Sequence, residues 1–125
     1  MKTIIAGSRT INDYELLKFV INDCPFKVTS VVCGLAKGVD KMGERYALEN
    51  GLPIYYFSAN WNQHGKAAGP IRNRKMAEHA EALIWLWDGE SKGTKNMIEI
   101  AKELGLKTHG AIFPEFKSPT IINHL

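Results

Sequence analysis

The chain has 125 residues and a formal net charge of +3, which suits one domain that buries roughly two-thirds of its unfolded surface. Its two cysteines, Cys24 and Cys33, form no C-x-x-C pair and have no histidine at metal-ligand spacing. This spacing argues against a disulfide framework and a metal site, and it predicts reduced thiols. No apolar run approaches the ~20 residues of a membrane span, and no secretory leader pattern is present. We therefore expect a cytoplasmic protein with no membrane partner and no bound metal.

Five short apolar runs, rich in β-branched and aromatic residues, alternate with segments of helical periodicity. This alternation predicts parallel β-α units. The expected strands are residues 2–6, 28–33, 53–57, 82–87 and 107–112. Helices are expected over 13–22, from 39 to a left-handed stop at Gly51, from Pro70 through Ala80, and from Gly93 to a stop at Gly105. The predicted fold class is α/β: a single Rossmann-like doubly wound domain, about five parallel strands with helices on both faces.

Apolar residues at helical spacing indicate which side chains each helix buries. The expected inward-facing residues are Leu16, Phe19, Val20, Val39, Met42, Tyr46, Ala47, Met76, Ala77, Ala80, Met97, Ile100, Ala101 and Leu104. The tail, residues 114–125, contains Pro114 and Pro119, which are unfavourable in a helix or a central strand. We expect this tail to pack on the domain or on a partner subunit.

Glycines are concentrated in the connections that run from a strand into a helix. Seven of the eleven glycines lie there, namely Gly7, Gly34, Gly38, Gly65, Gly69, Gly89 and Gly93. In a doubly wound sheet these connections share the carboxyl edge, where ligands bind at the point at which the strand order reverses. Tight turns alone would explain an even spread of glycines, whereas this asymmetry favours close approach of the backbone to a ligand.

The segment 64–76 combines glycines, a helix start and positive charge. Residues 51–76 contain no Asp or Glu, but they contain Lys66, Arg72, Arg74 and Lys75. Pro70 suits the first helical position, where its missing N–H has no intrahelical acceptor, and Gly69 suits the cap. Free N–H groups, the helix dipole and local positive charge favour an anion such as phosphate. The alternative is a solvated basic helix start.

Familiar phosphate-binding motifs are absent from the chain. Gly65-Lys66 is followed by Ala67, with Asn60 where a Walker A motif needs its first glycine, and no G-x-G-x-x-G follows the first strand. There is also no nucleophile elbow, zinc-ligand pair or kinase motif set. These absences argue against a P-loop enzyme and against a standard dinucleotide-binding dehydrogenase.

Four segments carry a family resemblance: Ala6-Gly7-Ser8-Arg9, Gly34-Leu35-Ala36-Lys37-Gly38-Val39-Asp40, the Gly-Lys-x-Ala-Gly-Pro-x-Arg-Asn string at 65–73, and Ser91-Lys92-Gly93-Thr94. In this order, over about residues 2–113, they resemble the YspA-like branch of the SLOG superfamily. This Rossmann-like group includes the LOG phosphoribohydrolases and the DNA-processing protein DprA. The resemblance implies a five-stranded parallel sheet that binds nucleotides or nucleotide-derived ligands at the glycine-bearing loops. Residues 1–113 are therefore expected to form the nucleotide-binding domain.

The resemblance is incomplete at the catalytic acid of the LOG-type enzymes. In those enzymes an Arg-Lys pair precedes a Gly-x-Gly-Thr loop, so Arg74 would match their important arginine. An acidic residue closely follows that loop in the family, but residues 95–97 here are Lys, Asn and Met. Glu99 is five residues beyond Thr94 and points about 140° away on a helix. The catalytic residues are therefore unknown, and the weak candidates are Asp40, Asp88 and Glu90.

Several candidate residues have more than one interpretation. Arg72 and Arg74 are about 200° apart on a helix, so only one is expected to face the ligand. Asp40 either caps the second helix or accepts hydrogen bonds from ribose hydroxyls. Trp61 either stacks on a base or packs against the tail, and Lys66 contacts phosphate, acts in a lid or is exposed. The predicted ligand-binding residues are Gly7, Ser8, Arg9, Gly34, Ala36, Gly38, Asp40, Trp61, Gly65, Lys66, Gly69, Arg72, Asn73, Arg74, Ser91, Gly93 and Thr94.

These features favour a sensor or sequestering protein that binds a nucleotide-derived small molecule of the ADP-ribose or cyclic nucleotide type. Whether the protein is an enzyme stays open, because the alternative is N-glycosidic hydrolysis or transfer on a nucleotide, as in the phosphoribohydrolases. A second alternative, suggested by the DprA relationship, is binding of single-stranded nucleic acid by the basic residues and Trp61. We expect a homodimer or higher homo-oligomer, and no cofactor.

Overall fold

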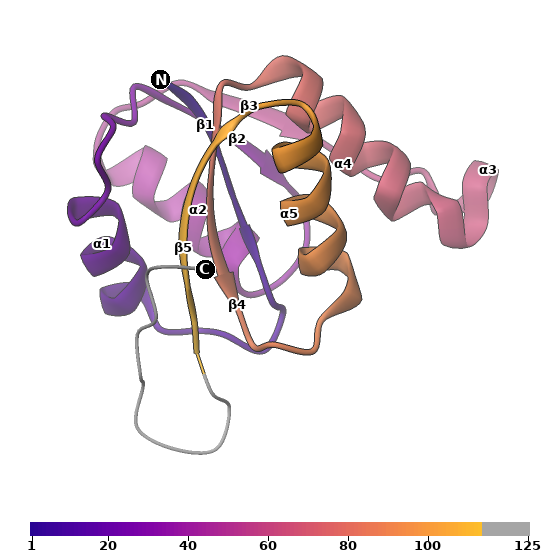
Figure 1. Cartoon of the computed structure of the whole chain (residues 1–125), viewed down its shortest axis with the longest axis horizontal. Helices are drawn as coiled ribbons and strands as arrows, with labels where there is room; N and C mark the ends of the chain where they lie inside the picture. The colour runs from indigo at the N-terminus through magenta and orange to yellow at the C-terminus, as the bar shows by residue number, and fades with distance from the viewer. Residues whose placement is uncertain (114–125) are drawn as a thin grey trace.

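The computed structural model describes residues 1–113 (Figure 1). The predicted tail, residues 114–125, lies outside the described residues. The elements in chain order are β1 (Lys2–Gly7), α1 (Tyr14–Asn22), β2 (Ser30–Gly34), α2 (Val39–Glu49), β3 (Ile54–Phe57), α3 (Trp61–His64), the 3-10 turn η1 (Gly65–Ala67), α4 (Ala68–His79), β4 (Ala82–Trp87), α5 (Lys92–Glu103) and β5 (Lys107–Ile112).

The five strands form one parallel sheet in the order β3-β2-β1-β4-β5. Helices α1 and α2 cover one face, and α4 and α5 cover the other (Figure 1). The predicted α/β class, with about five parallel strands and helices on both faces, is confirmed. Because all strands run in the same direction, every strand-to-helix connection lies at one edge of the sheet.

Each face of the sheet has its own apolar core. In β1, Ile5 belongs to the core beneath α1 and α2, whereas Ile4 and Ala6 belong to the core beneath α4 and α5. The same alternation divides β4, where Ile84 and Leu83 pack on opposite faces. Burial on both faces explains why the central strands are continuously apolar in sequence.

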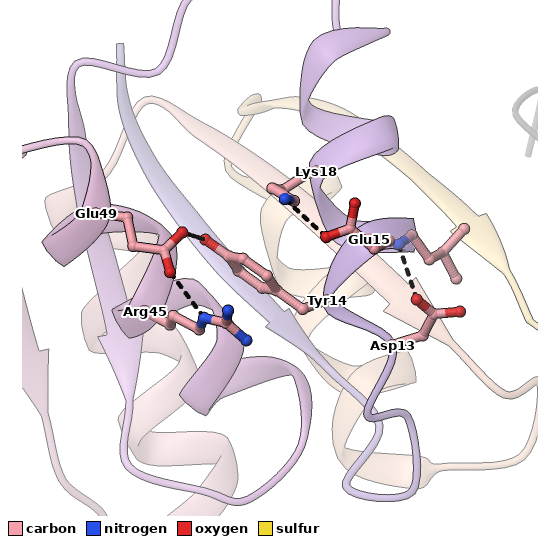
Figure 2. Close-up of polar contacts among 7 residues, drawn as sticks. Asp13, Tyr14, Glu15, Lys18, Arg45 and Glu49 are labelled. Atoms are coloured by element: carbon pink, nitrogen blue, oxygen red, sulfur yellow. Dashed lines mark hydrogen bonds and ion pairs between the residues drawn. The ribbon is translucent and has the colours of Figure 1, made fainter.

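Polar contacts connect α1 to α2 at the surface (Figure 2). The Tyr14 hydroxyl donates to Glu49 Oε1 (2.7 Å), and Arg45 Nε donates to Glu49 Oε2 (2.9 Å). The Arg45 guanidinium carbon also lies 3.9 Å from the centroid of the Tyr14 ring. Helix α1 itself begins after Asp13, whose Oδ1 accepts the Leu16 N–H (3.0 Å) and so caps the first turn.

Two predicted inward-facing residues are exposed instead. Phe19 is 53% exposed, because the buried stripe of α1 runs through Leu16, Leu17, Val20 and Ile21 and leaves position 19 on the opposite side. Leu104 is 40% exposed, because α5 ends at Glu103 and Leu104 is already its C-cap. The buried stripe of α1 is therefore narrower than the apolar pattern indicated, and α5 is shorter.

The connection at 58–69 is more helical than predicted. It contains α3, η1 and the start of α4, and Asn60 Oδ1 caps α3 by accepting the Gln63 N–H (3.1 Å). Helix α4 begins at Ala68 after an Ala67 cap, so Pro70 is its third residue rather than its first. Proline is compatible with that place because none of the first N–H groups of a helix has an intrahelical acceptor. In Figure 1, α3 lies beyond the N-terminal end of α4 and extends away from the sheet.

Both cysteines are free, and burial raises the pKa of Cys33 to about 12, so its thiol stays protonated at neutral pH. Within residues 1–113, no helix combines the length and apolarity needed to cross a bilayer. No three His, Cys, Asp or Glu side chains of these residues gather as metal ligands would.

Candidate functional site

A cavity of about 520 Å³ opens at the carboxyl edge of the sheet. Its lining comes from the connections after β1, β2, β3 and β4 and from the first turns of α4 and α5. Strand β1 lies between β2 and β4, so the cavity sits where the chain reverses its direction of strand addition. This is where doubly wound sheets bind ligands, and the volume lies within the range of small-molecule sites.

Most of the predicted ligand-binding residues come together in this cavity. The lining contains Gly7, Arg9, Ala36, Asp40, Trp61, Lys66, Gly69, Arg72, Asn73, Ser91, Gly93 and Thr94. Their contact with a ligand stays a prediction. The geometry shows that segments far apart in sequence share one hollow.

The described cavity lining is strongly basic. It contains four basic side chains, Arg9, Lys66, Arg72 and Lys92, and one acidic side chain, Asp40. Cations that converge on a partly enclosed space attract an anion more strongly than the same cations spread over a surface. The cavity therefore has the charge that a phosphorylated ligand requires.

Arg72 is the cation that the surrounding protein positions most closely. Its Nε donates to the side-chain oxygen of Asn73 (3.1 Å). Its Nη1 lies beside Gly34, where an added Cβ would collide with the guanidinium and would come within 2.8 Å of Asp40 Oδ2. Gly34 thus leaves room for the two charged groups, which explains a glycine at the end of β2. Burial lowers the pKa of Arg72, and the Asp40 carboxylate opposes that effect.

Asp40 lies in the first turn of α2 and is only 5% exposed. The N-cap of α2 is Gly38, with φ of 73°, so the capping role considered for Asp40 is wrong. Instead, Asp40 Oδ2 accepts the Ala36 N–H (3.3 Å) across the turn. Burial raises the pKa of Asp40 above its ordinary value, an effect that the charge of Arg72 opposes.

Asn73 connects the two helices that flank the cavity. Its side chain is 4% exposed, and its Nδ2 donates to Asn96 Oδ1 (2.9 Å) and to the Gly93 carbonyl (3.3 Å). The Asn73 oxygen meanwhile accepts from Arg72. One buried amide therefore fixes the distance between α4 and α5 and the orientation of the arginine.

The start of α5 is held open toward the cavity. Ser91 Oγ accepts the Thr94 N–H (3.4 Å) and the Thr94 hydroxyl (3.2 Å). The N–H groups of Lys92 and Gly93 belong to the first helical turn and have no intrahelical acceptor. Both residues line the cavity, so the positive end of the α5 dipole lies at its wall.

Asp88 supports this turn and lies outside the cavity lining. Its Oδ1 accepts the N–H groups of Glu90 and Ser91, both at 2.8 Å, and these contacts lower its pKa despite partial burial. Asp88 instead lines a second, smaller hollow. Glu90 is exposed and also lies outside both linings. Of the three weak catalytic candidates, only Asp40 faces the cavity.

Five predicted ligand-binding residues are outside the cavity lining: Ser8, Gly34, Gly38, Gly65 and Arg74. Ser8 is buried and its Oγ accepts the Asp88 N–H (3.0 Å), so it ties the β1 connection to the β4 connection. Arg74 is exposed and pairs with Glu103 of α5. As the helical angle predicts, only one of the two arginines lines the cavity. It is Arg72, so Arg74, which would match the important arginine of the LOG-type enzymes, lies outside the lining.

The cavity lining also includes residues that the sequence did not single out for the site: Ala6, Pro70, Met76, Lys92, Asn96 and Met97. Met76 and Met97 were predicted as core residues, and both are buried. They also line the cavity, because the cavity borders the core at this edge of the sheet. Lys92 could have been found from its place inside the Ser91–Thr94 helix start. No local signal identifies Asn96, whose partner Asn73 is 23 residues away.

The chain matches a family model and a phage protein. The model described as YspA, cpYpsA-related SLOG family matches residues 1–64. Gene 61 protein of Mycobacterium phage D29 is 29% identical over 115 residues, and this alignment covers 84% of the present chain and 91% of the phage protein. No solved structure gives a significant match. The residues of the family match carry Arg9, Ala36, Asp40 and Trp61, whereas α4 and α5 lie beyond them.

Proposed function

The chain belongs to the YspA, cpYpsA-related SLOG family, and from this premise we propose that its cavity binds a nucleotide-derived small molecule of the ADP-ribose or cyclic nucleotide type. The protein would act as a sensor of that molecule or would sequester it. Family membership supports a nucleotide-related ligand, and the choice among such ligands rests on the residues of the cavity.

The observation that carries this proposal is the charge of the cavity lining. The described lining contains one carboxylate and four cations, Arg9, Lys66, Arg72 and Lys92, and the open N–H groups at the start of α5 add a partial positive charge. An uncharged metabolite would leave these groups without a partner. A ligand with one or more phosphate groups would compensate them.

Trp61 supports the nucleotide part of the proposal. It is exposed, yet its ring lines the cavity, and it lies 3.5 Å from where a Cβ of Gly69 would stand. An exposed indole that forms the wall of a basic cavity gives a base a flat apolar surface for stacking.

The direct test is isothermal titration calorimetry of the protein with ADP-ribose, AMP, ADP, cyclic AMP and cyclic GMP. We expect micromolar or tighter binding of at least one of them and weaker binding at high salt, because the contacts are ionic. The affinity should fall strongly with Arg72→Gln and persist with Arg74→Gln, which removes the same charge from the same helix outside the cavity. Absence of binding by every compound would contradict the proposal.

N-glycosidic hydrolysis is the second candidate, and the position of Asp40 is the observation that favours it. A buried carboxylate with a raised pKa is a candidate general acid. Chromatography after prolonged incubation distinguishes the two candidates, because hydrolysis releases a free base and binding alone returns the intact nucleotide. The missing acidic residue after Thr94 makes binding without cleavage our first proposal.

The predicted homo-oligomer stays a proposal. Sedimentation velocity with and without the bound nucleotide would test it, and a sensor that works through assembly would change its sedimentation coefficient when the ligand is added.

A further inference from the structure

Asp40 is an unusual residue for an anion-binding cavity. It is 5% exposed and is the one acidic residue in the described lining. A buried carboxylate is costly to desolvate, and it repels a phosphate that enters the same space. Its position therefore calls for a role other than phosphate binding.

The surroundings of Asp40 leave part of its hydrogen-bonding capacity unused. The groups that act on its charge include the backbone N–H groups of Ala36 and Gly7 and the cations Arg72 and Arg9, and the Asp40 charge in turn helps to raise the pKa of the Cys33 thiol. An ionised carboxylate accepts about four hydrogen bonds, and the Ala36 N–H takes one of them at a long 3.3 Å. Because Asp40 also lines the cavity, a ligand there can supply further donors to its carboxylate.

Asp40 and the start of α5 lie on opposite sides of β1. Asp40 follows β2 and the Ser91–Thr94 turn follows β4, and these two strands flank β1. Asp40, Ser91 and Thr94 all line the same cavity, so one ligand can contact the carboxylate and the start of α5 at the same time. A nucleoside 5′-phosphate has the same order of groups, with hydroxyl donors on one side of the sugar and the phosphate on the other.

We propose that Asp40 accepts hydrogen bonds from the ribose 2′- and 3′-hydroxyls of the ligand, which makes the cavity selective for ribonucleotides over 2′-deoxyribonucleotides. This inference rests on the proposed function and specifies the sugar that the site recognises. In a 2′-deoxyribonucleotide the donor at the 2′ position is missing, so the buried carboxylate loses a partner that it gains from the ribose.

The test compares matched ligand pairs on the wild-type protein. AMP, ADP and ADP-ribose are each titrated against their 2′-deoxy counterparts by calorimetry. We expect at least one ribonucleotide to bind, and each one that binds to do so at least about tenfold more tightly than its deoxy form, the ratio that corresponds to loss of one hydrogen bond to a charged group.

The variant arm assigns the selectivity to Asp40. Asp40→Asn should reduce the ratio to below about threefold, because the amide is uncharged and has a weaker acceptor. Glu78→Gln removes the same charge from an exposed position on α4 and should keep the wild-type ratio. Thermal melts establish that each variant is folded, and the wild-type comparison stands without a variant if Asp40→Asn does not fold.

Each result has one meaning. Equal affinity of the wild type for ribo and deoxy forms would overturn the ribose site and leave nucleotide binding intact. An unchanged ratio in folded Asp40→Asn would show that another residue reads the sugar. Absence of binding by all six compounds and by cyclic AMP and cyclic GMP would overturn the proposed function itself.

Discussion

The two faces of the sheet connect their helices in different ways. On one face, α1 and α2 are joined at the surface by Tyr14, Arg45 and Glu49, above an apolar core. On the other face, α4 and α5 are joined by Asn73, an amide that is buried beside the cavity. The first link is accessible to water, so its loss is partly compensated by solvent. The second is centred on a side chain that is only 4% exposed, so solvent replaces its hydrogen bonds less readily.

This difference separates a contact that only supports the fold, between α1 and α2, from a link at the wall of the proposed binding cavity, between α4 and α5. The α1 and α2 face can lose a polar contact and keep the sheet intact. The α4 and α5 face holds Arg72 in its orientation through the same amide that fixes the two helices. On that face we therefore expect stability and ligand affinity to be coupled, and the variants below test that coupling.

The largest expected effect comes from Arg72. Arg72→Gln should weaken nucleotide binding by about 100-fold, which corresponds to about 2.7 kcal/mol, because it removes a charge-assisted contact inside the cavity. Calorimetry measures the affinity, and Arg74→Gln is the matched control with an expected change below about twofold. A similar loss in both variants would show that net charge rather than the cavity determines binding.

The next effect comes from Asn73. Asn73→Ala should lower the free energy of unfolding by about 1–3 kcal/mol, because it removes the two hydrogen bonds that the buried Asn73 amide donates to Asn96 and Gly93. Affinity should fall in the same variant, since Arg72 Nε loses its acceptor. Urea denaturation and calorimetry measure the two quantities. Asn96→Ala removes only one of the two acceptors of the Asn73 amide, so it should reduce stability and affinity less than Asn73→Ala does. A loss of stability with full affinity in Asn73→Ala would contradict the coupling of the two quantities.

A smaller effect is expected on the opposite face. Tyr14→Phe deletes the hydroxyl that donates to the exposed Glu49, and it should lower the free energy of unfolding by about 0.5–1 kcal/mol. Nucleotide affinity should not change. Weakened binding in this variant would contradict the separation of the two faces.

The smallest effect is a pH dependence of stability on the same face. Burial and the Glu49 carboxylate raise the pKa of Tyr14 to about 12, whereas the ordinary value is near 10. Between these values the unfolded chain loses the proton and the folded protein keeps it, so stability falls as pH rises from 10 to 12. The fall in urea midpoint from pH 9 to pH 11 should be larger for the wild type than for Tyr14→Phe. Tyr56, whose pKa is also raised to about 12, is present in both proteins and cancels in this comparison.

The sheet and the edge that carries the cavity follow from local sequence patterns. The bounds of β4 and β5 agree residue for residue with the predicted 82–87 and 107–112. For β4 the signal is a continuous apolar run, since a parallel strand buried on both faces is apolar on both. The glycines after β1, β2, β3 and β4 point to the carboxyl edge, because parallel topology puts all of those connections together. The helical angle also separates Arg72 from Arg74 correctly.

The remaining features depend on contacts between distant segments. The link from Asn73 to Asn96 joins two helices across 23 residues, and the buried position of Asp40 depends on the approach of Arg72 to Gly34. Helix α3 has no apolar stripe, since none of its residues is buried, so periodicity could not identify it. Its start is set by the capping side chain of Asn60, which cannot be distinguished in sequence from an ordinary loop asparagine.

The central claim is that the Arg72 cavity holds a nucleotide-derived molecule. Its most direct test is to incubate the purified protein with a nucleotide-metabolite extract, separate the protein from free compounds, and identify what it carries by mass spectrometry. We predict that the wild type and Arg74→Gln retain an intact nucleotide-derived compound and that Arg72→Gln does not. Recovery of no such compound, or equal recovery from Arg72→Gln, would contradict the account.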